Sequence, residues 1–353
     1  MLGIKVRKEN AEKAKRYLRQ RNLLNLNYKI FGKGRFIYIP VFRLDSAAAK
    51  MLNKFAAKPV IGKFAMQKRK MGKRLKDLIS TEEKEALAYD VLGNIAIINE
   101  SEHAKELAKA VMKANQNIKT VVMKKGAVKG KYRKRHYAYV LGKKNYIATY
   151  KENGCTFVFD IRKAFFSSRL AYERKRITEQ VKEQEHVLVM FAGVGPFAIE
   201  IAKHKRAEVA AIELNKYAYT SMLENARLNK TKITAVHGDV KKVARRFAGW
   251  ADRIVMPLPK SSYDFLEQAL ETAKNRCIVH YYTFGKKESV LEESKKAIKA
   301  FLNSHGAEPR FLFSRTVRPY SPSEVEIVVD FEVIGKRSMG AHKNGNKLKI
   351  VAT

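Results

Sequence analysis

Two apolar runs between residues 187 and 215 are joined by a glycine turn and followed by an acid. The first run, Val187 to Met190, leads into Phe191-Ala192-Gly193-Val194-Gly195-Pro196, and the second ends at Glu213. Glycines let the backbone approach a ligand closely, and a carboxylate after the next strand can accept hydrogen bonds from a ribose diol. The pattern predicts a strand, turn, helix and strand that bind a nucleotide-type cofactor. The alternative is an ordinary crossover that binds no ligand.

Two kinds of cofactor compete for this turn. Gly193-x-Gly195-x-x-Ala198, with an acid about 20 residues further on, satisfies the dinucleotide fingerprint of nicotinamide enzymes. Pro196, however, lacks the N–H that a pyrophosphate would use at the start of a helix. S-adenosylmethionine (SAM) has no phosphate, and Asp239, after a third apolar run, is suited to an adenine amino group. The pattern therefore favours a SAM-dependent methyltransferase.

Charge and composition indicate the class of partner. The 353 residues include 72 Lys and Arg against 34 Asp and Glu, a net charge of +38. Adaptation to heat would enrich residues of both charges, whereas this one-sided excess of cations favours a nucleic acid partner.

No apolar run approaches the ~18 residues needed to cross a bilayer, and no signal peptide is recognisable, so we expect a cytoplasmic protein without membrane contact. Two distant cysteines fit a reducing compartment, and the histidine spacing predicts no metal.

The remaining pattern indicates how the chain is organised. Strand and helix signals alternate over residues 187–300, as in an α/β sheet, and two final strands are expected at 311–317 and 325–334. Paired strands are expected at 27–30 and 36–41. Ser167 or Ser168 is expected to cap a helix that runs from Arg169 to about Lys182. Cations interleaved with tyrosines suit RNA phosphates and bases, the alternative being an exposed strand; they are Lys131, Arg133, Arg135 and Tyr137.

Several blocks of the sequence together resemble the archaeal and eukaryotic-type tRNA (guanine(37)-N1)-methyltransferases. They are DIRKAFFSSRLAYERKRITEQV, MFAGVGPFAIEIAK, ELNKYA, ENARLNK, HGDV and MPLPKSS, together with KENGCTFVFD and GIKVRKENAEKAKRYL. The resemblance extends to about residue 334. It implies a Rossmann-like class I SAM-dependent methyltransferase domain of the α/β class, preceded by two smaller α+β domains.

The same resemblance implies a three-part enzyme that acts on tRNA, while the basic, glycine-dotted composition of the last residues predicts a tail. Residues 1–62 are expected to dock on the outer corner of tRNA, residues 63–153 to form a basic RNA-binding domain, and residues 154–335 to form the methyltransferase domain. Residues 336–353 are expected to be a basic, mobile tail. We expect a monomer that also handles the anticodon loop and methylates guanine 37.

Site residues are carried over by position in the matching motifs. The expected SAM-binding residues are Phe165, Arg174, Phe191, Ala192, Gly193, Gly195, Pro196, Glu213, Leu214, Asn215, Asp239, Val240, Pro257, Leu258 and Pro259. The catalytic carboxylate falls on Glu173 and the catalytic arginine on Arg133, with Arg135 as a competitor. Glu173 would accept the N1 proton and the arginine would stabilise charge on O6. Without the resemblance, Glu173 is equally well a surface partner of Arg169.

Two departures from the family pattern affect the expected activity. Val189 stands where the family commonly has an acid, and Pro257-Leu258-Pro259 replaces the usual Asn-Leu-Pro. The Pro-Leu-Pro version resembles a subgroup that also methylates C7 of 4-demethylwyosine (imG-14), a tricyclic wyosine precursor. The alternatives to guanine 37 are a methyltransferase of ribosomal RNA or of another tRNA base, and an RNA-binding protein with a degenerate cofactor fold.

Overall fold

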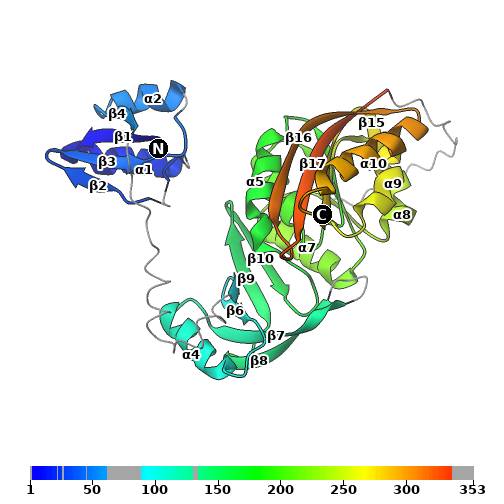
Figure 1. Ribbon diagram of the computed structural model, residues 1–353, viewed down its shortest axis with the longest axis horizontal. Helices are drawn as coiled ribbons and strands as arrows, with labels where there is room; N and C mark the ends of the chain where they lie inside the picture. Colours follow the sequence, from blue (N-terminus) through cyan, green and yellow to red (C-terminus); the bar gives the residue numbers. More distant parts are fainter. Residues whose placement is uncertain are drawn as a thin grey trace. The chain divides into compact units, whose positions relative to one another are not determined.

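The computed structural model describes residues 2–21, 23–25, 28–44, 46–61, 89–129 and 134–335, without the side chains of 127–129, 134 and 135. The chain divides into two compact units, residues 1–80 and 81–353 (Figure 1). Residues 62–88, which include the start of the expected basic domain, Lys131, Arg133 and the tail at 336–353 lie outside the described residues. The division into four regions stays a prediction.

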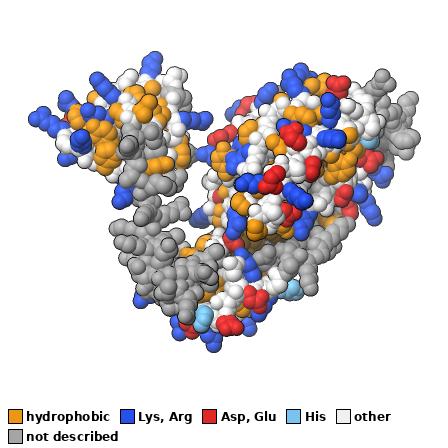
Figure 2. Space-filling view, viewed as in Figure 1, with side chains coloured by type: hydrophobic (Ala, Val, Ile, Leu, Met, Phe, Trp, Pro, Cys, Tyr) orange, Lys and Arg blue, Asp and Glu red, His pale blue; other side chains and the backbone are white. Residues whose placement is uncertain are grey.

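The first unit is a four-stranded antiparallel sheet with two helices. Its elements are β1 (Leu2–Arg7), η1 (Lys8–Asn10), α1 (Ala11–Gln20), β2 (Phe31–Lys33), β3 (Phe36–Pro40), α2 (Ser46–Asn53) and β4 (Lys58–Ile61), with the strand order β2-β3-β1-β4. Ile4, Leu18 and Ile39 lie in its buried core. Lys and Arg side chains are prominent on the face of this unit seen in Figure 2, where acidic side chains are sparse.

The predicted pair of strands in this unit is half right. The strand expected at 36–41 is β3, but its partner is β2 at Phe31–Lys33 and not residues 27–30, of which Asn27 lies outside the described residues. Phe31 is the register partner of Tyr38, and their rings stack with centroids 4.9 Å apart. The cross-strand aromatic pair therefore sets the register, which polar–apolar alternation alone did not reveal.

The second unit begins with a four-stranded sheet and a hairpin. The sheet has the order β5-β6-β7-β8, formed by β5 (Tyr89–Leu92), β6 (Ile95–Ile98), β7 (Thr120–Lys129) and β8 (Lys134–Gly142), with α4 (Ala104–Ala114) between β6 and β7. The hairpin is β9 (Ile147–Glu152) and β10 (Cys155–Asp160). Asp90 in β5 binds Lys124 at 2.9 Å and Arg169 at 2.8 Å, which ties this sheet to the segment before the next helix.

A seven-stranded sheet forms the rest of the unit, in the order β13-β12-β11-β14-β15-β17-β16. The first five of these strands are parallel and β17 runs antiparallel to β15. The elements are η3 (Ser168–Leu170), α5 (Ala171–Gln180), β11 (His186–Met190), α6 (Pro196–His204), β12 (Glu208–Glu213), α7 (Lys216–Leu228), β13 (Thr234–His237), α8 (Val240–Val243), η4 (Ala244–Phe247), β14 (Ala251–Met256), η5 (Ser262–Phe265), α9 (Leu266–Thr272), β15 (Ala273–Lys286), α10 (Val290–Ser304), β16 (Glu308–Pro319) and β17 (Glu324–Ile334). The expected α/β sheet with two final strands is confirmed.

Side chains that alternate along β11 belong to two different cores. Val187 and Val189 pack with α5, α6 and α7 on one face of the sheet. Leu188 and Met190 pack with α8, α9 and α10 on the other face. This alternation follows from the two-residue repeat of a strand covered on both faces. Val189 is consequently a core residue, fully buried, and does not face a ligand.

The expected serine cap of α5 is wrong. A single turn of 3-10 helix, Ser168–Leu170, precedes the helix, and neither it nor α5 has a side-chain cap. The carbonyl of Ser167 instead accepts a hydrogen bond of 3.0 Å from the Arg174 guanidinium. The chain leaves the helix at Val181, which is extended, so Lys182 lies beyond its end.

Glu200 of α6 is a buried acid whose proton affinity is altered by the fold. Its carboxylate accepts a hydrogen bond of 3.1 Å from Asn153 in the β9–β10 turn. Burial raises the pKa of Glu200 to about 7, and the nearby Glu152 carboxylate adds to the effect, while Asn153 and Arg174 oppose it. In the unfolded chain the same group titrates near 4.5.

Replacing Glu200 with Gln is expected to stabilise the protein at high pH. The folded state retains the Glu200 proton up to about pH 7. The unfolded state releases it near 4.5, so the free energy of unfolding falls as pH rises between these values. Glu200→Gln removes this loss, and we expect the free energy of unfolding of the variant to exceed that of the wild type by about 1–3 kcal/mol at pH 8 and to match it near pH 4, below both pKa values. Urea denaturation at the two pH values measures the difference. The exposed Glu183→Gln is the control, and equal curves for Glu200→Gln and wild type at pH 8 would contradict the assignment.

Candidate active site

The turn after β11 reverses the chain through left-handed backbone conformations. Phe191, Gly193 and Gly195 have φ values of 57°, 59° and 91°. A Cβ on Gly195 would lie 2.7 Å from Met222 Cγ and 2.8 Å from a methyl group of Ile199, so this glycine is required by both conformation and space. Phe191 adopts a conformation that costs a non-glycine residue about 1 kcal/mol or more, a strain that is common at ligand sites.

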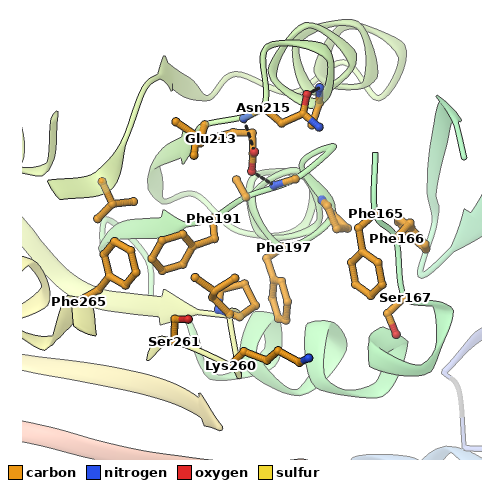
Figure 3. A pocket seen from close by; sticks show the side chains of 18 of the residues that line it. Phe165, Phe166, Ser167, Phe191, Phe197, Glu213, Asn215, Lys260, Ser261 and Phe265 are labelled. Carbon is orange, nitrogen blue, oxygen red and sulfur yellow. Dashed lines mark hydrogen bonds between the residues drawn. The ribbon is translucent and has the colours of Figure 1, made fainter. Parts of the chain in front are cut away.

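Glu213, at the end of β12, holds this turn in place through hydrogen bonds. Its Oε2 accepts a hydrogen bond of 2.7 Å from Gly193 N–H, and its Oε1 accepts one of 2.7 Å from Asn215 N–H (Figure 3). Burial raises the pKa of Glu213, although these backbone donors favour the charged form. Each carboxylate oxygen retains a further lone pair, so Glu213 can still accept hydrogen bonds from a bound diol.

A pocket of about 500 Å³ opens at the carboxyl ends of β11, β12, β13 and β14. In Figure 3, Phe191 and Phe265 lie on one side of it and Phe165 and Phe166 on the other, with Phe197 between them. The strand order reverses between β11 and β14, and such a switch point is where open α/β sheets bind ligands. The pocket is therefore the candidate cofactor site.

Most of the residues that we expected to bind SAM line this pocket. They are Phe165, Arg174, Phe191, Ala192, Gly193, Pro196, Glu213, Leu214, Asn215, Asp239, Val240, Pro257 and Leu258. Gly195 and Pro259 are not among the lining residues: Gly195 is the N-cap of α6, and the Pro259 carbonyl accepts a hydrogen bond from Phe284 N–H. The binding role of each residue stays a prediction.

The pocket fits a nucleoside without phosphates better than it fits a dinucleotide. Pro196, at the first position of α6, has no N–H, and the N–H of Gly193 is already bound to Glu213. The turn thus offers a pyrophosphate few of the donors that it would need. The Asp239 side chain caps α8 through Lys241 N–H at 3.1 Å, which holds that acid at the rim. SAM, which presents an adenosine and a sulfonium, meets these conditions.

Arg174 forms part of the pocket wall with its charge already compensated. Its Nε and Nη2 bind the two carboxylate oxygens of Glu152 at 2.5 and 2.8 Å, and the side chain is 1% exposed. The guanidinium also lies over the Phe166 ring, 5.1 Å from its centroid. Arg174 therefore connects the β9–β10 hairpin to the pocket.

The neighbouring residue, Glu173, points into a different buried cluster. Its Oε2 accepts hydrogen bonds from Arg176 Nε at 3.0 Å, Arg176 Nη2 at 2.8 Å and the Tyr282 hydroxyl at 2.9 Å. Its Oε1 is buried and has no hydrogen-bond partner among the described residues. Glu173 is 1% exposed, so the alternative of a surface pair with Arg169 is wrong; Arg169 pairs with Asp90.

The cluster around Glu173 continues through the sheet. Arg176 Nη1 binds Asp330 on β17 at 2.5 Å, and the other oxygen of Asp330 accepts a hydrogen bond of 2.7 Å from His280 Nδ1 on β15. His280 Nε2 accepts a hydrogen bond from Arg253 on β14 at 2.8 Å, and Arg253 binds Glu185 at 3.0 Å. Because arginine only donates, His280 is neutral here, with its proton on Nδ1.

Sequence reasoning missed the residues that hold Glu173 and several that line the pocket. Tyr282 and Asp330 join the cluster only through the fold, whereas Arg176 is three residues after Glu173 on α5 and could have been indicated by that helical spacing. Phe197 directly follows Pro196 and could have been included from its position in the turn. The other lining residues not foreseen are Phe166, Ser167, Leu170, Ala218, Gly238, Lys241, Lys260, Ser261, Asp264 and Phe265.

The expected RNA-binding group is only partly visible. Lys131 and Arg133 lie outside the described residues, and Arg135 is in β8 without a described side chain. Tyr137 packs partly buried against the core. Their contacts with RNA stay a prediction.

Among the described residues no group of acids, histidines and cysteines could hold a metal ion, and no helix is long and apolar enough to cross a membrane.

Changing Glu213 to Gln is expected to weaken SAM binding. The amide nitrogen of Gln would face either Gly193 N–H or Asn215 N–H, so one buried donor would lose its acceptor. We expect an increase in Kd of about 10- to 100-fold, from a loss of about 1.5–3 kcal/mol. Calorimetric titration with SAM measures it. Glu208→Gln, on the same strand and exposed, is the matched control; a Kd for Glu213→Gln like that of the control would refute the role.

Comparison with known proteins gives three matches along the chain. The TRM5/TYW2 methyltransferase domain matches residues 148–308, the tRNA methyltransferase 5 N-terminal domain matches residues 3–48, and the TYW2 N-terminal domain matches residues 71–145. The pocket and all of the Glu173 cluster except Asp330 lie within the first match.

Individual relatives agree with these matches. The tRNA (guanine(37)-N(1))-methyltransferase Trm5b of Pyrococcus abyssi is 32% identical over 94% of this chain and 99% of the relative. Its crystal structure superposes with a TM-score of 0.68 over 95% and 99% of the two chains. The tRNA (guanine(37)-N(1))/4-demethylwyosine(37)-methyltransferase Taw22 of Nanoarchaeum equitans is 27% identical over 60% of this chain and 89% of the relative.

A further structure contains the expected cofactor. Methanocaldococcus jannaschii TYW2, solved in complex with AdoMet, is 25% identical, covers 70% of this chain and 100% of its own, and has a TM-score of 0.57. AdoMet is SAM, so a nicotinamide cofactor is no longer a competitor for the pocket. With the nearly complete match to Trm5b, these findings show that the chain belongs to the SAM-dependent tRNA (guanine(37)-N1)-methyltransferase family.

Proposed function

We propose that the protein transfers a methyl group from SAM to N1 of guanine 37 in tRNA, with Glu173 as the general base. The observation that carries the proposal is Glu173 Oε1, which accepts no hydrogen bond from the described residues and belongs to a buried carboxylate oriented by Arg176 and Tyr282. The adjacent residue, Arg174, lines the cofactor pocket, so one turn of α5 serves both the base and the cofactor site.

Guanine N1 holds a proton and is a poor nucleophile until the proton leaves. SAM supplies an electrophilic methyl group on a sulfonium, and its transfer leaves a neutral thioether. Glu173 Oε1 accepts the N1 proton as the new N–C bond forms, and Arg176 and Tyr282 keep the carboxylate oriented through Oε2. Negative charge develops on O6, which Arg133 or Arg135 stabilises.

The SAM site is assigned to the lining residues described above. Glu213 would bind the ribose diol through its remaining lone pairs, and the aromatic side chains of the pocket would enclose the adenosine and the methionine part. Expulsion of water from such a pocket favours methyl transfer, because it strengthens the electrostatic interactions within the site.

The partner that we propose is tRNA, bound by a monomeric enzyme in the cytoplasm. The first unit would dock on the outer corner, and the second would take the anticodon loop through Lys131, Arg133, Arg135 and Tyr137. The net charge of +38 supports strong contact with the RNA backbone. Guanine 37 must leave its stack before N1 can reach Glu173.

The experiment that tests this function is methyl transfer from labelled SAM to two tRNA transcripts, one with guanine and one with adenine at position 37. Nucleoside analysis should find 1-methylguanosine in the first transcript only. Label in neither transcript, together with label in ribosomal RNA or at another base of cellular tRNA, would favour the alternative methyltransferase.

Replacing Glu173 with Gln should slow the chemical step without preventing folding. The amide oxygen can still accept from Arg176 and Tyr282, while the proton acceptor is lost. We expect the single-turnover rate at saturating SAM and tRNA to fall by about 10²- to 10⁴-fold. The control is Glu179→Gln, on the same helix and exposed. A rate within a few-fold of the control, in a variant that melts normally, would exclude Glu173 as the base.

A second substrate is favoured by the Pro-Leu-Pro segment that lines the pocket and by the similarity to Taw22. We propose that the enzyme also methylates C7 of 4-demethylwyosine 37. Pro257 removes the amide of the usual Asn at this edge of the pocket, which leaves more room for a tricyclic base. tRNA carrying this precursor should gain a methyl group, and Pro257→Asn should lower that activity by more than it lowers guanine methylation. Methylation of guanine 37 alone by the wild type would refute the second activity.

A further inference from the structure

The buried cluster that holds Glu173 has a charge imbalance. It contains three carboxylates, Glu173, Asp330 and Glu185, but only two guanidinium groups, Arg176 and Arg253. The remaining member, His280, is neutral, and burial lowers its pKa in spite of the neighbouring Asp330. One negative charge is therefore left to be balanced from outside the cluster, and the unpartnered atom, Glu173 Oε1, is where it is least compensated.

Arg315 forms an ion pair with that oxygen. Its Nη1 lies 3.6 Å from Glu173 Oε1, beyond hydrogen-bond distance but well within ion-pair range. Arg315 is on β16, the edge strand of the sheet, and its side chain is 34% exposed. The guanidinium lies over the ring of Tyr172, 4.6 Å from the centroid, and that ring is 61% exposed. A partly exposed guanidinium and an exposed aromatic ring thus lie together, and the guanidinium also borders Glu173 Oε1.

The chemistry of guanine places a second atom beside this guanidinium. N1 and O6 are separated by a single carbon and lie on the same edge of the base. A guanine that donates N1–H to Glu173 Oε1 must therefore bring O6 close to any donor that borders this oxygen. The exposed ring of Tyr172 offers such a base a surface for stacking.

Resting on the proposed role of Glu173, we propose that Arg315 is a substrate-contacting residue: it covers Oε1 in the absence of RNA and donates to O6 of the target guanine when Glu173 accepts the N1 proton. During transfer, the N1–H bond breaks toward Oε1 and the N1 electron pair forms the bond to the methyl carbon. The electrons of the sulfur–methyl bond return to sulfur. The enolate-like negative charge that builds on O6 as the N1 proton leaves is met by Arg315, which supplements or replaces the arginine expected at 133 or 135.

The test replaces the oxygen that Arg315 would contact. Single-turnover methylation is measured at saturating SAM with tRNA that carries guanine or 6-thioguanine at position 37, because sulfur is a much weaker hydrogen-bond acceptor than oxygen. The ratio of the two rates is compared among the wild type, Arg315→Ala and Arg310→Ala. Arg310 is the matched control, since it lies on the same strand, is exposed and pairs with Glu332 away from the cluster.

We expect Arg315→Ala to slow methylation of normal tRNA by about 10²-fold. We also expect it to change the oxygen-to-sulfur rate ratio by about fivefold or more, since the two changes remove the same contact. Arg310→Ala should leave the ratio within about twofold of the wild type, whatever its effect on tRNA affinity. A purely structural role, or a role in binding phosphates, would slow both substrates alike.

An unchanged ratio in Arg315→Ala would overturn the proposal, even if the variant were slow. Arg315→Lys keeps the charge and tests whether the geometry of the guanidinium is needed; it should recover part of the rate. The rate ratio measured for Arg315→Ala can be interpreted whether or not Glu173 proves to be the general base. If Glu173→Gln remains active, the proposed base is wrong, whereas the rate ratio at position 315 still reports whether this arginine contacts O6.

Discussion

The buried ionic chain from Glu173 to Glu185 is the interaction on which the active site depends. It joins α5 to β17, β15 and β14, so the sheet itself fixes the orientation of the carboxylate. Loss of one member would leave a charge without a partner in the interior, at a cost of about 3–5 kcal/mol. Ionic chains of this kind are a poor means of gaining stability, and hydrophobic packing would serve better. The presence of this ionic chain is explained if its purpose is to hold the Glu173 carboxylate in one orientation.

The proposed cofactor site and the proposed base are built from different parts of the domain. The turn after β11 and the strand ends line the pocket, whereas the cluster around Glu173 would present the base. Arg174 and Glu173 are consecutive, yet the first is tied to Glu152 on the β9–β10 hairpin and the second to Tyr282 on β15. A rotation of α5 would disturb both sets of contacts at once. α5 therefore links the pocket wall at Arg174 to the proposed base at Glu173.

Local patterns and long-range contacts explain what the sequence could predict. The apolar runs at 187–190 and 208–213 and the glycine turn are local signals, and most of the expected cofactor residues line the pocket. Tyr282 is 109 positions from its partner Glu173, and Asp330 is 154 positions from its partner Arg176, so no periodicity connects these residues. The serine cap failed for a related reason: the carbonyl of Ser167 is used by Arg174, so the backbone there follows a tertiary contact in place of the usual cap.

Burial of the base has a chemical consequence. The Glu173 side chain is 1% exposed, so in the proposed reaction the guanine proton would pass to it directly and without a chain of water molecules. Three hydrogen bonds on Oε2 keep the carboxylate in place, whereas Oε1 accepts none from the described residues. Oε1 is therefore the atom that we propose takes the proton, provided that a cation meets the charge left on the base.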